Sequence, residues 1–236
     1  MFKKMECELC HLPLNYPLNW KSLFSKKPFI ENHCCEECFR TFKMIRDNKN
    51  ICRYCMKEVR VGKNICSDCQ YWLEKEGKIE SYHRALFSYD EAMQHYFREY
   101  KFKGNIKLAK VFSKEIHQGL YYELNERIIV PIPMSQTSFL KRGFNPVEEF
   151  LVQAEIPFLK ILNKNQETVP QSSKNRPERL QLEQPFVIDY KLKRQVKRRK
   201  VIIVDDIYTT GQTIHLAKKC LLENGIRTDF TFSLTR

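Results

Sequence analysis

Residues 201–213 read Val-Ile-Ile-Val-Asp-Asp-Ile-Tyr-Thr-Thr-Gly-Gln-Thr, and this stretch decides the fold. Its four leading β-branched residues predict a strand that is buried on both faces, as strands of parallel sheets are. Two carboxylates follow where the strand should leave the sheet, and hydroxyls around one glycine precede a helical run. The stretch therefore predicts the strand, loop and helix of an α/β fold, in which ligands bind outside the carboxyl ends of the strands.

The loop after this strand has the chemistry of a phosphate site. Backbone N–H groups and hydroxyls at a helix N-terminus bind anions, and a glycine lets the backbone approach a ligand closely. The residues expected around the phosphate are Thr209, Thr210, Gly211, Gln212 and Thr213. Asp205 and Asp206 would stand beside it and accept hydrogen bonds from sugar hydroxyls. A helix cap would explain one polar residue here, but not two adjacent acids and three threonines, so we favour the phosphate site.

The same stretch resembles the 5-phosphoribosyl-diphosphate (PRPP) signature of type I phosphoribosyltransferases. A hydrophobic strand followed by Asp-Asp and Thr-Thr-Gly-x-Thr is far more specific than a lone glycine-rich loop. The resemblance implies a type I phosphoribosyltransferase-like fold, which is a mainly parallel sheet flanked by helices.

The length of the chain limits the number of domains, and its net charge indicates the kind of partner that it binds. The 236 residues are enough for one α/β core and a small appended module. The 41 Lys and Arg against 28 Asp and Glu give a net charge of +13, which favours anionic partners such as nucleotides, nucleic acid or phosphorylated substrates. We find no apolar run of about 18 residues and no apolar signal core at the N-terminus. We therefore expect a soluble, cytoplasmic protein without membrane insertion.

Cysteine pairs dominate the first 70 residues. Nine of the ten cysteines lie there, mostly as Cys-x-x-Cys, and in a reducing compartment this arrangement indicates metal rather than disulfides. The four pairs are Cys7/Cys10, Cys35/Cys38, Cys52/Cys55 and Cys66/Cys69. Two such pairs complete one tetrahedral zinc site. We predict two zinc ions, both structural because protein thiolates fill all four positions of each.

Spacing alone allows two pairing orders of the cysteines. Residues 52–69 have the compact spacing of a zinc ribbon, whereas a longer insert separates the first two pairs. We favour sequential sites (first pair with second, third with fourth) over a cross-braced arrangement. Cys34 also has a permissible spacing to Cys38, but we favour Cys35 as the ligand.

We place a double zinc-ribbon-like module at residues 1–76 and a phosphoribosyltransferase-like domain at 81–236. In the second part, strands are expected near 84–89, 127–133, 201–204 and 227–235, and helices over 91–102, 105–120, from about 146 to 154, and 214–223. A polar loop over 134–145 carries Lys141, Arg142 and Gly143, which suit contact with a diphosphate. Residues 164–181 are polar throughout and predict a lid or a disordered loop. The basic run 191–200 is interpreted as a solvated loop.

Several features together resemble the ComF family. They are the paired cysteines, Tyr100-Lys-Phe-Lys-Gly104, Val130-Pro-Ile-Pro133, Arg142-Gly-Phe-Asn145, Thr168-x-x-Gln171, Glu178-Arg179 and the Asp-Asp-x-x-Thr-Thr-Gly signature. The resemblance spans nearly the whole chain and implies a zinc-binding module joined to a type I phosphoribosyltransferase-like domain. It also implies a role in natural transformation, with an ATP-driven translocase of the ComFA type as a partner during DNA uptake.

The resemblance also implies roles for individual residues. Asp205 and Asp206 would hold the ribose hydroxyls and act as the catalytic acids, and residues 209–213 would hold the 5-phosphate. Arg142 and its neighbours Lys141 and Gly143 would form the diphosphate loop, with residues 165–181 as a mobile lid. Lys101 and Lys103 would contact phosphate. Mg²⁺ would bridge the diphosphate and ribose oxygens of PRPP.

Three functions remain open at this point. The leading hypothesis is a PRPP-binding phosphoribosyltransferase-like protein of DNA uptake, with turnover undecided. The second is a non-catalytic zinc-containing adaptor that binds single-stranded DNA and the translocase, which the basic run favours. The third is a nucleobase phosphoribosyltransferase with a zinc appendage.

Overall fold

The computed structural model describes residues 5–14, 30–79, 81–164, 184–196 and 199–236. The predicted lid, apart from Lys164, lies outside these residues, as does most of the insert between the first two cysteine pairs. Within the described part of the chain no helix is long and apolar enough to cross a membrane.

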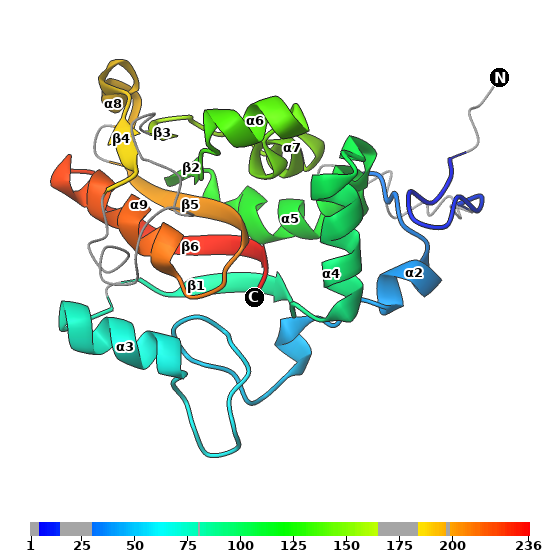
Figure 1. Cartoon of the computed structure of the whole chain (residues 1–236), viewed down its shortest axis with the longest axis horizontal. Coiled ribbons are helices and arrows are strands. Elements are labelled where there is room, and N and C mark those ends of the chain that lie inside the picture. The colour runs from blue at the N-terminus through cyan, green and yellow to red at the C-terminus, as the bar shows by residue number, and fades with distance from the viewer. Residues whose placement is uncertain (1–4, 15–29, 80, 165–183, 197–198) are drawn as a thin grey trace.

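A parallel sheet of four strands forms the centre of the molecule (Figure 1). Its order is β1 (His83–Phe87), β6 (Thr228–Thr235), β5 (Lys200–Ile207) and β2 (Arg127–Pro131), and all three pairings are parallel. A separate antiparallel pair joins β3 (Leu162–Lys164) to β4 (Phe186–Ile188). The α/β fold with a parallel sheet, predicted from the sequence, is confirmed.

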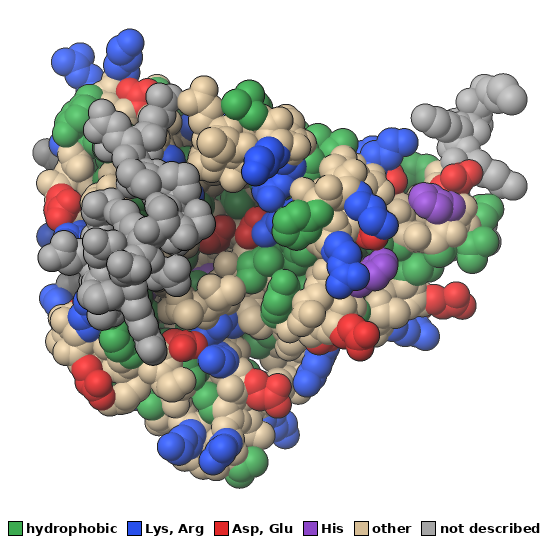
Figure 2. Space-filling model, in the orientation of Figure 1, with side chains coloured by type: hydrophobic (Ala, Val, Ile, Leu, Met, Phe, Trp, Pro, Cys, Tyr) green, Lys and Arg blue, Asp and Glu red, His purple; other side chains and the backbone are tan. Residues whose placement is uncertain are grey.

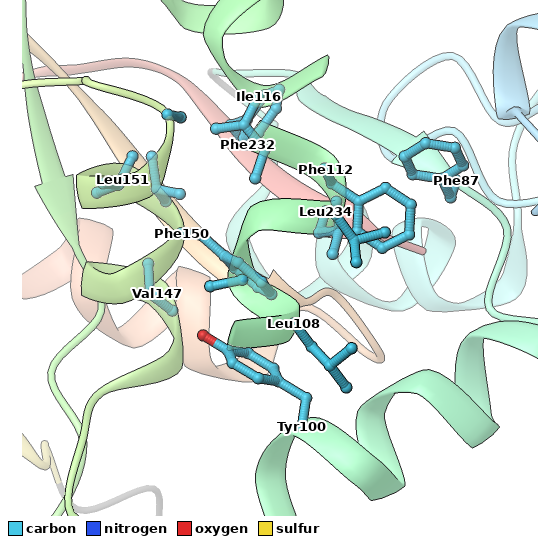
Figure 3. Close-up of a cluster of buried hydrophobic side chains, with 14 of the residues drawn as sticks. Phe87, Tyr100, Leu108, Phe112, Ile116, Val147, Phe150, Leu151, Phe232 and Leu234 are labelled. Atoms are coloured by element: carbon cyan, nitrogen blue, oxygen red, sulfur yellow. The ribbon is translucent and has the colours of Figure 1, made fainter. Parts of the chain in front are cut away.

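The two faces of β5 bury alternate residues, as the period of a strand requires. Ile202 and Val204 pack into the larger core cluster together with the aromatic side chains of the helices on that face. Val201 and Ile203 pack on the other face, against residues of the C-terminal helix. Figure 3 shows the larger cluster, in which Phe112 and Phe150 approach the sheet residues Phe232 and Leu234. Both faces of β5 are therefore covered, which explains its uninterrupted apolar run.

Helices cover both faces of this sheet (Figure 1). Residues of α5 (Ser113–Leu120) and α7 (Pro146–Gln153) pack on one face and those of α9 (Gln212–Glu223) on the other. The chain also forms α4 (Glu91–Phe97), α6 (Gln136–Arg142) and α8 (Tyr190–Val196), the last of which lies beyond β4 (Figure 1). The helix expected over 91–102 changes at Arg98 into a π-helical turn, η2 (Arg98–Phe102). The helix expected over 105–120 begins as a 3₁₀ segment, η3 (Ile106–Phe112), and a short 3₁₀ turn, η4 (Tyr121–Glu123), follows it.

Two segments interpreted as loops are partly helical, and local contacts explain both errors. In the polar segment 134–145, the hydroxyl of Ser135 accepts a hydrogen bond from the N–H of Ser138 and caps α6. In the basic run, the carboxylate of Asp189 accepts from the N–H of Lys191 at the start of α8. Val196 at the end of α8 is buried and anchors that helix. A short cap and one apolar contact thus outweighed the polar composition on which the loop interpretation rested.

The cysteine-rich segment packs directly on the α/β part. It contains α2 (Glu36–Arg40), a 3₁₀ turn η1 (Ile45–Asp47) and α3 (Ser67–Glu76). Phe42 lies edge-on to Phe87 of β1 and to Phe112, at centroid distances of 6.2 and 4.9 Å. The proposed boundary between residues 76 and 81 falls between α3 and β1, but side chains from its two sides share one core.

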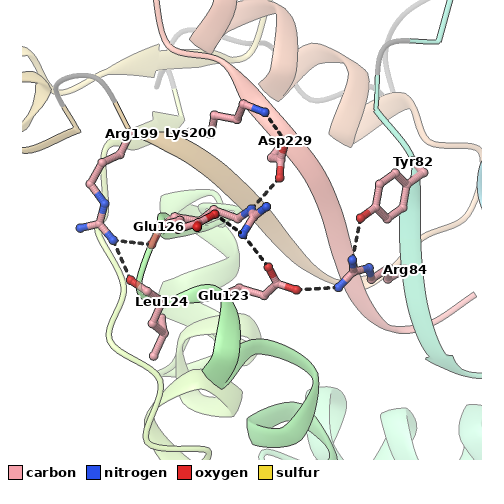
Figure 4. A network of polar contacts seen from close by, with 9 residues as sticks. Tyr82, Arg84, Glu123, Leu124, Glu126, Arg199, Lys200 and Asp229 are labelled. Carbon is pink, nitrogen blue, oxygen red and sulfur yellow. Dashed lines mark hydrogen bonds and ion pairs between the residues drawn. The ribbon is translucent and has the colours of Figure 1, made fainter.

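Charged side chains tie together the amino ends of the strands (Figure 4). Arg127 of β2 contacts Asp229 of β6 at 2.5 Å and Glu123 at 2.9 Å. Lys200 of β5 contacts Asp229 at 2.8 Å, and Arg84 of β1 contacts Glu123 at 2.8 Å. We call these five residues the amino-end network. Every strand of the sheet contributes to it, and it lies at the end of the sheet opposite the candidate site.

Candidate functional site

Two acids lie together at the carboxyl end of β5. The carboxylate of Asp206 is 2.7 Å from the Nζ atom of Lys101, and the two side chains are only 15% and 13% exposed. Lys101 Nζ also lies 4.5 Å from the ring centroid of Phe97, which is the geometry of a cation–π contact. Asp205 accepts a hydrogen bond from the backbone N–H of Asp206 at 2.9 Å. The acid pair therefore shares one lysine, brought from a distant part of the chain.

The surroundings of the acid pair disfavour the ionised form of Asp205. Desolvation, followed by the charge of Asp206, raises the pKa of Asp205 from its ordinary value of 3.8 to about 7, although Lys101 and Lys164 act in the opposite direction. Ionisation of one carboxylate raises the free energy needed to ionise the other, because the two negative charges repel. Lys164, at the end of β3, is a contributor that the sequence patterns did not indicate.

The π-helical turn η2 positions Lys101. Arg142 at the end of α6 donates from Nε to the carbonyl of Lys101 at 3.0 Å, so the predicted diphosphate loop lies against this turn. Gly143 ends α6 with a φ of 82°, in the left-handed region. Lys103 and Lys141 have exposed side chains, and Lys103 contacts Glu99 at 2.8 Å. Lys101, Lys103 and Lys141 were all predicted to contact phosphate or diphosphate, and of these three the structure brings Lys101 to the acids.

The loop of residues 208–211 connects β5 to α9 and requires glycine at its end. Gly211 has a φ of 85°, and a Cβ atom there would lie 2.2 Å from the hydroxyl of Tyr208. Tyr208 is buried beneath the loop, where its ring centroid lies 4.1 Å from that of His83. Any larger residue at 211 would push this tyrosine out of place, so the conformation depends on glycine. We call residues 208–211 the phosphate loop.

Three consecutive N–H groups of the phosphate loop are available to a ligand. Among the described residues, no hydrogen-bond acceptor is found for the backbone N–H of Thr209, Thr210 or Gly211. The first N–H groups of α9, from Gln212 and Thr213, continue the series because a helix leaves them without an intrahelical partner. Successive free N–H groups before a helix form an anion-binding concavity.

The far side of the phosphate loop contacts residues that sequence patterns did not single out for this site. The indole of Trp72 in α3 donates to the carbonyl of Thr210 at 2.7 Å. Arg236, just after β6, donates to the carbonyls of Tyr208, at 3.2 Å, and of Thr209. Both residues are distant in sequence from the loop, and no spacing rule connects them to it.

Figure 2 shows that the face carrying this end of the sheet is hollowed near its centre, with acidic and basic side chains at the bottom of the hollow. A recessed position suits a ligand site, because displacement of water strengthens hydrogen bonds and ion pairs to a ligand.

The eight predicted zinc ligands form two clusters. Within each cluster, the four sulfur atoms lie within 4.8 Å of one another; the clusters are Cys7, Cys10, Cys35 and Cys38, and Cys52, Cys55, Cys66 and Cys69. Thiolates about 2.3 Å from one zinc ion in tetrahedral geometry are about 3.8 Å apart, and the Sγ atoms of Cys10 and Cys35 are 3.8 Å apart. The donor sets fit two structural zinc ions in the sequential arrangement. Cys34 lies outside the first cluster, and its thiol donates to the carbonyl of Cys35 at 3.4 Å.

Comparison with known proteins agrees with this geometry. Residues 102–227 match the family described as "Phosphoribosyl transferase domain". The chain is 39% identical to a protein named "Competence protein ComFC" from Streptococcus pneumoniae, over 98% of this chain and all of that protein. It is 29% identical to a protein of the same name from Bacillus subtilis, over 94% of this chain and 90% of that one.

Proposed function

The chain belongs to the phosphoribosyl transferase domain family and, within it, to the ComF family, and from this premise we propose that it binds PRPP at the end of β5 in support of natural competence. The observation that carries the proposal is the juxtaposition of an acid pair with three free N–H groups, four residues further along the chain. The first suits the hydroxyls of a pentose, and the second suits the phosphate on its 5-position.

The acid pair has the properties of a site for vicinal hydroxyls. Near neutral pH, Asp205 is divided between its charged and protonated forms because its pKa is raised to about 7. It can therefore both accept hydrogen bonds from hydroxyls and donate one. Asp206 is held by Lys101 in the absence of ligand, and Lys101 would turn to the diphosphate when a sugar takes its place. Bound with the substrate, Mg²⁺ would supply positive charge between diphosphate and ribose oxygens.

Calorimetric titration with PRPP and Mg²⁺ tests the binding function. We expect saturable binding by the wild type and a loss of at least about 100-fold in the double variant Asp205→Ala/Asp206→Ala, because both hydroxyl contacts disappear. Asp47→Ala removes an exposed acid from η1 and serves as the matched control, with unchanged affinity. Absence of binding by the wild type, or equal binding by the double variant, would refute the proposal.

The role in competence is proposed from the relatives, both of which are named competence proteins. We infer that the chain works with an ATP-driven translocase of the ComFA type as single-stranded DNA enters the cell. Co-elution of the two purified proteins would support the partnership, and separate elution at micromolar concentrations would count against it. Turnover is a further step, tested by release of diphosphate from PRPP in the presence of a purine or pyrimidine base.

The adaptor function has one specific observation in its favour. Lys191, Lys193 and Arg194 of α8 have exposed side chains, whereas Arg199 is bound to backbone carbonyls and Lys200 to Asp229. A salt-dependent single-stranded DNA shift that is lost in Lys191→Ala/Lys193→Ala/Arg194→Ala would support DNA contact through α8. No shift with the wild type would reject direct DNA binding and leave PRPP binding as the function to pursue.

A further inference from the structure

The second cysteine cluster (Cys52, Cys55, Cys66 and Cys69) lies against the back of the phosphate loop. Helix α3 begins directly after Cys66 and contains Cys69. Trp72 follows Cys69 by three residues and so lies on the same side of the helix, where its indole donates to the carbonyl of Thr210 at 2.7 Å. Its ring stacks on His215 of α9, with centroids 3.9 Å apart and planes 8° apart. The first turns of α3 thus join a metal-ligand site to the loop and to the helix that follows it.

Arg236 makes a second connection between the same two sites. Its guanidinium is 3.3 Å from the Sγ atom of Cys55 and 3.1 Å from the carboxylate of Asp68, which lies in the first turn of α3. The same guanidinium donates to the carbonyls of Tyr208 and Thr209. With its side chain only 6% exposed, Arg236 has little freedom to leave these partners. One side chain therefore bridges a metal-ligand thiolate and the phosphate loop.

These contacts determine the direction of the N–H groups on the other side of the loop. In a trans peptide, the carbonyl and the N–H of the next residue point in opposite directions, and the structure has no cis peptide bonds among the described residues. Arg236 and Trp72 hold the carbonyls of Tyr208, Thr209 and Thr210 on the side facing the cysteine cluster. The N–H groups that follow these carbonyls are those of Thr209, Thr210 and Gly211, and they must point away from that cluster.

We propose that the second cysteine cluster, through Arg236 and Trp72, positions the phosphate loop, so that metal at this cluster and PRPP at the loop stabilise each other. The loop-positioning part stands on the contacts above, and the coupling part rests on the proposed PRPP binding. Arg236 and Trp72 act as positioning residues, because they contact the side of the loop that faces away from the free N–H groups.

The metal is needed because small cysteine ribbons fold with their ion. When zinc is bound, the Cys55 thiolate keeps its charge and accepts the charge-assisted hydrogen bond of Arg236. Loss of zinc would loosen the turn that begins α3, and the donors of both Trp72 and Arg236 would lose their fixed positions. By linkage, any factor by which zinc tightens PRPP binding must also be the factor by which PRPP tightens zinc.

Backbone ¹⁵N relaxation of the loop amides tests the positioning directly and needs no ligand. In the zinc-loaded protein, the order parameters of the Thr209, Thr210 and Gly211 amides should be about 0.85, and Arg236→Met should lower them below about 0.6, since two carbonyl contacts are lost. Trp72→Phe is a milder variant that keeps an aromatic ring against His215 but loses the N–H donor and part of the indole ring, so it should act in the same direction. Arg199→Met is the matched control, because Arg199 also donates to two carbonyls, those of Leu124 and Arg127, but at the opposite end of the sheet.

Zinc release and PRPP titration test the coupling. Saturating PRPP should slow the removal of one of two zinc equivalents by a colorimetric chelator at least about fivefold, and Arg236→Met should abolish this protection and weaken PRPP binding about tenfold. If the wild type binds PRPP and these variants match it in loop order parameters, affinity and zinc release, the inference is overturned. If the wild type fails to bind PRPP but Arg236→Met still frees the loop, the positioning holds and the proposed function is what fails.

Discussion

The two ends of the parallel sheet both collect charged residues, but they balance them in opposite ways. At the amino end, Asp229 has two cationic partners, Arg127 at 2.5 Å and Lys200 at 2.8 Å. At the carboxyl end, Asp206 pairs with Lys101 at 2.7 Å, and the adjacent Asp205 has no ion pair among the described residues. Each end contributes similar residue types from several strands and helices. The difference therefore lies in the ratio of cations to acids.

The pKa values of Asp229 and Asp205 are shifted in opposite directions by this difference. The hydrogen bond from Lys200, and that from Arg127, lower the pKa of Asp229 from 3.8. Desolvation and the neighbouring Asp206 raise the pKa of Asp205 to about 7. A satisfied network stabilises the fold, whereas a group held away from its preferred charge state is typical of a site that awaits a ligand. The pKa shifts of Asp229 and Asp205 thus have opposite signs, as expected for a satisfied network at one end of the sheet and a ligand site at the other.

The largest effect on stability is expected at the amino end. Arg127→Met should lower the free energy of unfolding by about 2–4 kcal/mol, because it leaves Asp229 and Glu123 half-buried with fewer partners. Urea unfolding at pH 7 would measure this. Arg46→Met is the control, since Arg46 is 75% exposed and lies 3.9 Å from Asp47, and its effect should stay below about 0.5 kcal/mol. Equal effects of the two substitutions would show that the amino-end network is not structural.

Neutralising one acid at each end should change stability in opposite directions. Asp205→Asn should stabilise the ligand-free protein at pH 8 by on the order of 1–2 kcal/mol, since it removes a carboxylate whose ionisation the fold disfavours. Asp229→Asn should destabilise it by about the same amount, since it removes a carboxylate whose ionisation the fold favours. Thermal unfolding of both variants between pH 4 and pH 8 would measure the effects.

The pH dependence of the two variants distinguishes the two causes. The folded pKa of Asp205 lies above its unfolded value of 3.8, so the wild type loses stability as pH rises from about 4 to about 7, and Asn relieves that loss. The folded pKa of Asp229 lies below 3.8, so its contribution is present above that value and is lost as pH falls through the folded pKa. The difference between Asp205→Asn and the wild type should therefore shrink as pH falls to 4, whereas that of Asp229→Asn should persist at pH 4. A stabilising effect of Asp205→Asn that persists at pH 4 would contradict the explanation by charge.

The sequence predicted one side of the candidate site and missed the other. Residues 205–213 are contiguous, and their strand–acid–glycine order is a local pattern, so spacing alone indicated a phosphate loop. Trp72, Arg236 and Lys164 reach the same place from α3, the end of β6 and β3. Each is an ordinary residue in its own segment, and only the tertiary packing of that segment gives it a role. Tertiary contacts of this kind have no periodicity to detect.

The fold shows the same division between local and long-range information. The strands β1, β2, β5 and β6 were predicted because apolar runs identify buried strands. Composition alone misassigned α6 and α8, whose stability depends on the caps Ser135 and Asp189. The π-helical turn at residues 98–102 was also missed, although it places Lys101 beside Asp206. The sequence patterns predicted a regular helix here, but the irregular turn is the part of it that brings Lys101 to the site.

The smallest expected effect is a shift in the titration of the acid pair. Lys101→Met should raise the apparent pKa of the pair by about half a unit to one unit, because the charge that opposes protonation of Asp205 disappears. Side-chain carboxyl carbon chemical shifts followed by NMR would measure it. Lys107→Met, six residues along the chain with an exposed side chain, should leave the titration unchanged. If both variants titrate like the wild type, Lys101 does not balance the acids, and of the two lysines that oppose protonation of Asp205 Lys164 would remain. The contrast with the amino end would then be sharper still, and the proposed exchange of Lys101 from Asp206 to a diphosphate would have to be abandoned.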